Sequence, residues 1–167
     1  MNMKRFLPWI GLLVRLGLAG VFIVAGALKV TDLPASGRAV VAYELMPTNV
    51  AMTVGAIQPF FELMLGALLL IGLATRVTAL ISALTMVAFI AGITSAWARG
   101  LNIDCGCFSK GGHLPPGVTP NYLPEILRDI GFLAMAIFLM LYPVSRFSLD
   151  GWINKPEGDV RTDDEQA

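Results

Sequence analysis

Two cysteines separated by a single glycine are the residues in this sequence best suited to redox chemistry. Cys105 and Cys107 are the only cysteines in the 167-residue chain, and Gly106 lies between them. A disulfide between cysteines so close in sequence closes a small, strained ring, and a strained disulfide is more easily reduced than a structural one. Glycine gives the backbone the freedom that such a ring needs. The pair therefore predicts reversible thiol–disulfide exchange, with both cysteines as catalytic residues.

Nearby charges should influence the reactivity of these thiols, because the thiolate is the nucleophile. Arg99 and Lys110 flank the pair in sequence and would support a thiolate, as would Arg128 if the fold brings it close. The adjacent Asp104 would oppose it.

Metal binding is an alternative use of the same loop. Cys105, Cys107 and His113, the only histidine, could supply three ligands for Cu(I) or Zn(II). The methionines are spread over separate predicted segments and add no compact group of soft ligands. Two chemically idle thiols are a third possibility, and the sequence alone does not choose among the three.

The composition indicates an integral membrane protein. Hydrophobic residues make up 56% of the chain and charged residues only 14%, which lies far outside the range of soluble domains. The formal net charge is zero, so nothing in the electrostatics favours binding to nucleic acid. The expected environment is therefore membrane lipid.

The order of apolar runs and helix breakers predicts an all-α, four-helix transmembrane bundle. The apolar runs are long enough to cross a bilayer, and we expect them to span it at residues 6–30, 50–74, 77–98 and 123–142. A short helix at the membrane surface is expected between the first two spans. The cysteines fall in a loop of about residues 100–122, whose prolines predict irregular structure. Residues 1–145 then form one membrane domain, and the polar tail, 146–167, is expected to be disordered in the cytoplasm.

Four spans place both termini on one side of the membrane and the cysteine loop on the other. Lys29, Arg99 and Arg128 each have an acidic neighbour in sequence, so they are set aside as possible functional charges. The remaining basic residues are then more numerous on the side of the termini, which predicts cytoplasmic termini in the plasma membrane. The cysteine loop would face the extracytoplasmic space, where disulfides persist.

A second group of candidate residues is formed by charges inside the predicted spans: Arg15, Glu62, Arg128 and Asp129. A charge at membrane depth is costly unless it is paired, so these side chains should face the interior of the bundle. Either arginine could pair with Glu62. The group could be a structural ion-pair network. Alternatively, Glu62 or Asp129 could carry protons, or the group could bind a quinone carbonyl beneath the cysteine loop.

Six short segments are informative together: residues 25–29, 42–47, 59–63, 73–76, 99–108 and 127–129. They resemble the methylamine-utilisation membrane protein (MauE) branch of the DoxX-like family. The resemblance covers about residues 10–142, and the Asp-Cys-Gly-Cys-Phe segment with the Arg-Asp pair is its most specific part.

This resemblance implies a four-helix membrane bundle that takes part in thiol–disulfide exchange outside the cytoplasm, beside a thioredoxin-like partner. It assigns Cys105 and Cys107 as the redox pair and Glu62, Arg128 and Asp129 as the polar core. More distant DoxX-like proteins are associated with quinone-linked assemblies. We therefore expect a membrane thiol–disulfide oxidoreductase, coupled to membrane quinone. The main alternative is a non-enzymatic accessory subunit of a larger membrane, respiratory complex, and Cu or Zn binding is a lesser one.

Overall fold

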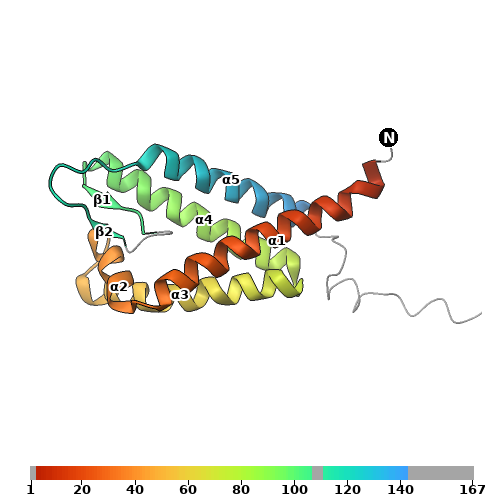
Figure 1. Cartoon of the computed structure of the whole chain (residues 1–167), viewed down its shortest axis with the longest axis horizontal. Helices are drawn as coiled ribbons and strands as arrows, with labels where there is room; N and C mark the ends of the chain where they lie inside the picture. Colours follow the sequence, from red (N-terminus) through yellow and green to blue (C-terminus); the bar gives the residue numbers. More distant parts are fainter. Residues whose placement is uncertain (1–2, 107–110, 143–167) are drawn as a thin grey trace, which may run out of the picture.

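The computed structural model describes residues 3–106 and 111–142, and most of these residues are helical (Figure 1). Two short strands pair antiparallel between the last two helices, with Ile103 opposite His113 and Asp104 opposite Gly112. Cys107, Lys110 and the tail lie outside the described residues, so the predictions made for them stay predictions. The elements are α1 (Met3–Val30), α2 (Leu33–Ala42), α3 (Thr48–Ile71), α4 (Thr75–Ala98), β1 (Ile103–Asp104), β2 (Gly112–His113) and α5 (Tyr122–Leu141).

Three of the predicted spans are confirmed as helices long and apolar enough to cross a membrane. They are Leu7–Val30 within α1, Thr48–Ile71 and Thr75–Ala98. The fourth, α5, has 20 residues, or about 30 Å of helix, but Glu125, Arg128 and Asp129 lie in its first turns. These charges make its first half too polar to be identified as a span by composition. The count of four spans is therefore not confirmed.

The helices run back and forth between two ends of the molecule (Figure 1). The start of α1 and the connection between α3 and α4 lie at one end, and α2 and the two strands lie at the other. Helix α1 packs against α3 and α5, and α4 packs mainly against α5. The candidate redox loop is thus held at the end opposite the start of α1.

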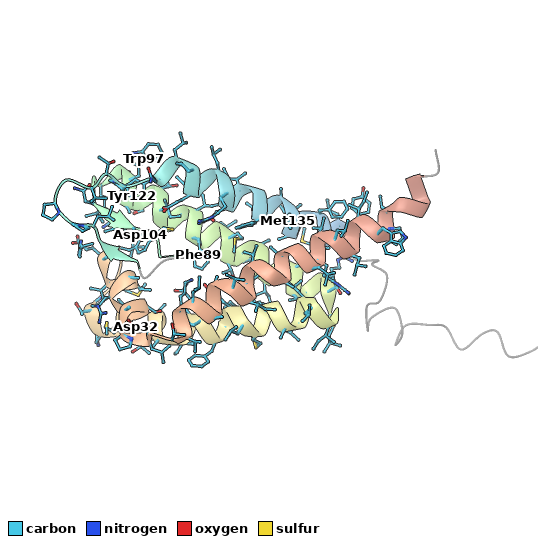
Figure 2. The ribbon with its side chains drawn as sticks, viewed as in Figure 1. Asp32, Phe89, Trp97, Asp104, Tyr122 and Met135 are labelled. Atoms are coloured by element: carbon cyan, nitrogen blue, oxygen red, sulfur yellow. The ribbon has the colours of Figure 1, made fainter. Side chains whose placement is uncertain are left out.

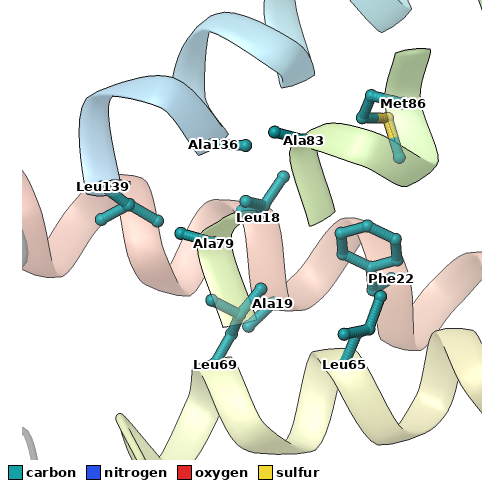
Figure 3. Close-up of a cluster of buried hydrophobic side chains, with 10 residues drawn as sticks. All are labelled: Leu18, Ala19, Phe22, Leu65, Leu69, Ala79, Ala83, Met86, Ala136 and Leu139. Atoms are coloured by element: carbon teal, nitrogen blue, oxygen red, sulfur yellow. The ribbon is translucent and has the colours of Figure 1, made fainter. Parts of the chain in front are cut away.

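The main apolar core fills the space between α1, α3, α4 and α5 (Figure 3). Leu18 and Phe22 of α1 lie there with Leu65 and Leu69 of α3, all nearly fully buried. The remaining buried members are Ala19, Ala79, Ala83, Met86, Ala136 and Leu139. Large apolar side chains also point outward, as expected where helices contact lipid.

Glycines set the close approach of α1 to α3. A Cβ atom at Gly26 would lie 2.8 Å from the carbonyl oxygen of Pro59, so only glycine fits this crossing. Small residues allow helix backbones to approach closely where lipid gives no hydrophobic driving force. The crossing places Lys29, one turn after Gly26, beside Glu62, the third residue after Pro59.

The predicted short helix after the first span is confirmed as α2. The Asp32 side chain caps its start by accepting a hydrogen bond from the backbone N–H of Ala35 at 3.0 Å. Half of its residues are buried, because α2 packs against α3 and β2.

The expectation that the cysteine loop contains no regular structure was wrong. Residues flanking the cysteine segment form the antiparallel pair of β1 and β2. The prolines of the loop, from Pro115 onward, follow β2 in sequence. They therefore remove no backbone donor from the pairing.

Candidate functional site

Cys105 lies directly after β1, in a small apolar cluster of its own. Its residue is 8% exposed, and its neighbours in the cluster include Ile93, Ile103 and Tyr122. The segment that carries it is hydrogen-bonded to the end of α2 and to α5. Tyr43, which follows α2, donates from its hydroxyl to the carbonyl of Cys105 at 2.9 Å.

Tyr122 anchors the start of the same segment from α5. Its hydroxyl donates to the carbonyl of Leu101 and accepts from the backbone N–H of Ile103 at 3.2 Å. Its ring packs against Trp97 of α4, with 6.3 Å between the ring centroids, and Figure 2 shows both residues near Asp104. Cys105 is therefore positioned by a network of tyrosines rather than held on a loosely attached loop.

Gly106, between the two cysteines, has a left-handed backbone with φ +70°. A Cβ atom there would lie 3.1 Å from Gly111 and 3.3 Å from the Ala39 side chain. Gly111, also left-handed with φ +60°, packs against the same alanine. Two glycines thus allow the two ends of the cysteine segment to close onto α2.

Two charged side chains of α5 contact the Cys105 side chain. Arg128 Nη2 lies 3.9 Å from Sγ, and the carboxylate of Glu125 shares a hydrogen bond with the thiol. Arg128 also holds Asp129, whose Oδ1 accepts from Nε at 3.0 Å and from Nη2 at 2.9 Å. Glu125 was not among the residues predicted from the sequence to take part in chemistry. Its spacing of three from Arg128, which puts both on one face of a helix, was the available signal.

The other described candidates of the loop, Arg99 and His113, have different surroundings from Cys105. The guanidinium of Arg99 donates to the backbone carbonyls of Tyr43 and Glu44, and so ties the end of α4 to the end of α2. His113 is exposed on β2. A group of possible metal ligands is instead formed by Asp104, Cys105 and Glu125, whose donor atoms lie within 4.8 Å of one another. The predicted metal ligands were Cys105, Cys107 and His113, so this group is a different one. Cys107 lies outside the described residues.

A cavity of about 280 Å³ lies beneath Cys105. Its wall is mostly apolar and is supplied by α2, α3 and α4. Cys105 and Gly106 line it on one side, and Lys29 and Gln58 add polar groups. The remaining lining residues are Ser36, Ala39, Val40, Tyr43, Leu45, Met46, Val54, Ala88, Phe89 and Gly92.

The ion pair inside the bundle differs from the one predicted. Glu62 Oε1 accepts from Lys29 Nζ at 2.6 Å and from Gln58 at 3.0 Å, so the expectation that an arginine pairs with Glu62 was wrong. Arg15 is also buried, but it lies 14 residues before Lys29 on α1, or about 21 Å along the helix axis. Arg128 is bonded to Asp129 instead.

A second, much smaller cavity of about 20 Å³ is lined by Lys29, Glu62 and Asp129. Glu62 Oε2 and Asp129 Oδ2 are buried and have no hydrogen-bond partner among residues 3–106 and 111–142. A space of this size with several polar groups can hold one water molecule. Since Lys29 lines both cavities, it connects the buried carboxylates with the space beneath Cys105.

A comparison with known protein families finds a match over most of the chain. The family model of methylamine utilisation protein MauE matches residues 7–142, which include all the described site residues. The chain belongs to the MauE family. No curated protein and no solved structure matches it significantly.

This MauE family protein therefore combines, at one end of a membrane bundle, a buried sulfur, a contacting cation and carboxylate, and an apolar cavity. A cation beside sulfur stabilises the thiolate, and a hydrogen-bonded carboxylate can accept the thiol proton. The arrangement can thus support thiol chemistry at the boundary between the loop and the helices.

Proposed function

We propose that this MauE family protein is a membrane thiol–disulfide oxidoreductase in which Cys105 and Cys107 cycle between dithiol and disulfide. The observation that supports this most directly is the contact of Arg128 Nη2 with Cys105 Sγ, together with the Glu125 hydrogen bond. An idle buried cysteine needs no such neighbours. A reactive one needs a cation for its thiolate and an acceptor for its proton.

Exchange proceeds through a mixed disulfide, so one sulfur reacts with the partner protein and the other resolves the intermediate. Cys105 is only 8% exposed and lines an internal cavity. We therefore assign the mixed disulfide with the partner to Cys107 and its intramolecular resolution to Cys105. The exchange is reversible, and with quinone as the oxidant it runs toward oxidation of the partner. A reduced partner attacks Cys107 of the disulfide, and Cys105 leaves as a thiolate and takes a proton from Glu125. The second thiol of the partner then breaks the mixed disulfide, so the partner leaves oxidised and the Cys105 and Cys107 pair is left reduced.

The setting of this reaction is also part of the proposal. We place the protein in the plasma membrane, with α5 as a fourth span, cytoplasmic termini and the cysteine loop on the extracytoplasmic side. Apolar side chains exposed along the whole of α5, from Leu123 to Leu141, support its contact with lipid. The exchange partner is a thioredoxin-like protein, and electrons pass to a membrane quinone. We also propose that the chain is related to the wider DoxX-like family.

Trapping of the mixed disulfide tests the proposal. A Cys105→Ser variant lacks the resolving sulfur, so it should accumulate a covalent adduct with an oxidised or activated thioredoxin-fold protein. A Cys107→Ser variant should form little. Absence of adduct in both single variants, with a double Cys→Ser variant as the background, would refute thiol–disulfide exchange.

The accessory-subunit alternative makes a different prediction. If the cysteine loop only docks onto a larger membrane complex, Cys105→Ser should leave the biological output of that complex unchanged.

The metal alternative draws on the group formed by Asp104, Cys105 and Glu125. An argument against metal binding is that the guanidinium of Arg128 lies 3.9 Å from the sulfur and would repel a metal cation. Stoichiometric copper or zinc in the purified protein, lost on replacing Cys105, would favour it.

A further inference from the structure

We propose that the cavity beneath Cys105 binds the head group of a lipid-soluble quinone, which reoxidises the cysteine pair. This inference rests on the proposed function. It assigns a binding site and a chemical class to the compound that oxidises the cysteine pair. It is carried by the cavity itself, which has about 280 Å³ of mostly apolar space and is lined by both Cys105 and Lys29.

The polar groups of the cavity suit a neutral ligand that carries hydrogen-bond acceptors. Lys29 and Gln58 both line it, and both are held in place by their bonds to Glu62. The ammonium group of Lys29 also lies 5.5 Å from the centre of the Phe89 ring, which forms part of the same wall. A carbonyl oxygen placed at Lys29 would therefore find a donor, and an aromatic ring would find Phe89.

The mouth of the cavity suits entry from lipid. Leu45, Met46 and Val54 line it and are 54%, 37% and 42% exposed. An exposed apolar rim favours a membrane-dissolved ligand over a water-soluble nucleotide, whose phosphates would need several cationic donors. The volume is at the lower end of small-molecule sites, which suits a single ring system with its tail left in the bilayer.

The chemistry of a closing disulfide requires an acceptor of two electrons and two protons. The Cys105 and Cys107 thiols lose their protons, one S–S bond forms, and two electrons pass to the quinone. The quinone gains two O–H bonds and leaves as quinol, so atoms and charge balance. Glu125 takes the Cys105 proton. The Cys107 proton is released to water at the loop. The quinone takes up two protons, one of them donated by Lys29, which regains its own from the water-sized cavity that it shares with Glu62 and Asp129, and the other from water.

Blocking the cavity tests this site without touching the cysteines. Gly92 lines the cavity, and a Cβ atom there would meet Tyr43 only at ordinary contact distance, so Gly92→Leu should fold and fill the space. The full chain in lipid nanodiscs, reduced and freed of reductant under anaerobic conditions, is mixed with decylubiquinone, and quinol formation is followed by absorbance. We expect about one quinol per chain for the natural protein and at least a tenfold slower rate for Gly92→Leu.

Matched control variants separate the effect of filling the cavity from a general destabilisation of the protein. Gly131→Leu adds the same bulk to α5 at a position with open space, and it should react at the natural rate. At the mouth, Val54→Trp should slow quinol formation, whereas Ile57→Trp, on the same helix but outside the cavity lining, should not. Equal rates for Gly92→Leu and Gly131→Leu, or for the two tryptophan variants, would overturn the site.

Failure of this inference can be told from failure of the proposed function. Calorimetric titration of decylubiquinone into the Cys105→Ser protein measures binding without redox chemistry, and Gly92→Leu should weaken it at least tenfold. If the natural protein exchanges disulfides with a thioredoxin-fold partner but neither binds nor reduces the quinone, the quinone site is wrong and the exchange function stands. If the quinone binds but no exchange occurs, the site stands and the exchange function is wrong.

Discussion

Lys29 and Glu62 are 33 residues apart in sequence, yet Nζ of one lies 2.6 Å from Oε1 of the other inside the helical bundle. Lys29 is 7% exposed and Glu62 is 1% exposed. Their pairing depends on the glycine crossing of α1 and α3 one turn away. Lys29 also lines the cavity beneath Cys105, and both residues line the smaller cavity, so the same contact links the stability of the bundle with its candidate chemistry.

Replacing Lys29 by Met should strongly destabilise the protein. The change leaves the Glu62 carboxylate buried without its cation, which typically costs about 3–5 kcal/mol. The free energy of unfolding can be measured by SDS titration in mixed micelles. The double variant Lys29→Met/Glu62→Leu should regain much of the loss, because it removes both charges. Arg76→Met, at the exposed start of α4, is the control variant. A Lys29→Met protein no less stable than this control would contradict the account.

Replacing Arg128 by Gln should slow the reaction of Cys105 with iodoacetamide. In a Cys107→Ser background at pH 7, we expect a rate roughly 5- to 10-fold lower, equivalent to about 1 kcal/mol of thiolate stabilisation by a partly exposed cation. Arg76→Gln, which removes a charge far from the loop, should react at the natural rate. An unchanged rate in Arg128→Gln would show that the 3.9 Å contact does not activate the sulfur.

Replacing Gly106 by Ala should loosen the segment that holds Cys105. A left-handed backbone costs a non-glycine residue about 1–2 kcal/mol, and here the added Cβ would also crowd Gly111 and Ala39. Amide hydrogen exchange of residues 101–106 should therefore become faster. Gly100→Ala is the matched control, because its φ of +67° imposes the same strain while its Cβ has open space. A Gly106→Ala effect no larger than that of Gly100→Ala would exclude a role for the packing.

Replacing Tyr43 by Phe should free the carbonyl of Cys105. Loss of one hydrogen bond of 2.9 Å should destabilise the loop by about 0.5–1.5 kcal/mol. Faster alkylation of Cys105 in the folded protein would report this loosening. Tyr142→Phe removes a hydroxyl after the end of α5 and should have no such effect.

The apolar runs and helix breakers were sufficient to predict the helices. Three spans and the short helix α2 followed from run length and from the Asp-Leu-Pro break after α1. The short β pair was missed because two-residue strands leave too weak a pattern to detect. Prolines later in the loop also suggested irregular structure throughout.

The partners of the buried charges could not be predicted in the same way. Sequence gives the depth of a charge along its helix but not the rotation of one helix against another, so it offered the two arginines as candidate partners of Glu62 without choosing between them. The crossing at Gly26 decides the rotation and selects Lys29. Glu125 was overlooked for a similar reason: nothing in the sequence shows that the first turn of α5 folds against Cys105.

The central claim is that the Cys105 and Cys107 pair changes oxidation state as part of the protein's work. Thiol alkylation on intact membranes tests it most directly, using a membrane-impermeant, mass-shifting maleimide with and without prior reduction. We predict that the extracytoplasmic loop is labelled at Cys107 after reduction and not beforehand, and that this labelling is lost again once the reductant is replaced by quinone. Labelling that never depends on the reductant, or that occurs only from the cytoplasmic side, would contradict the account.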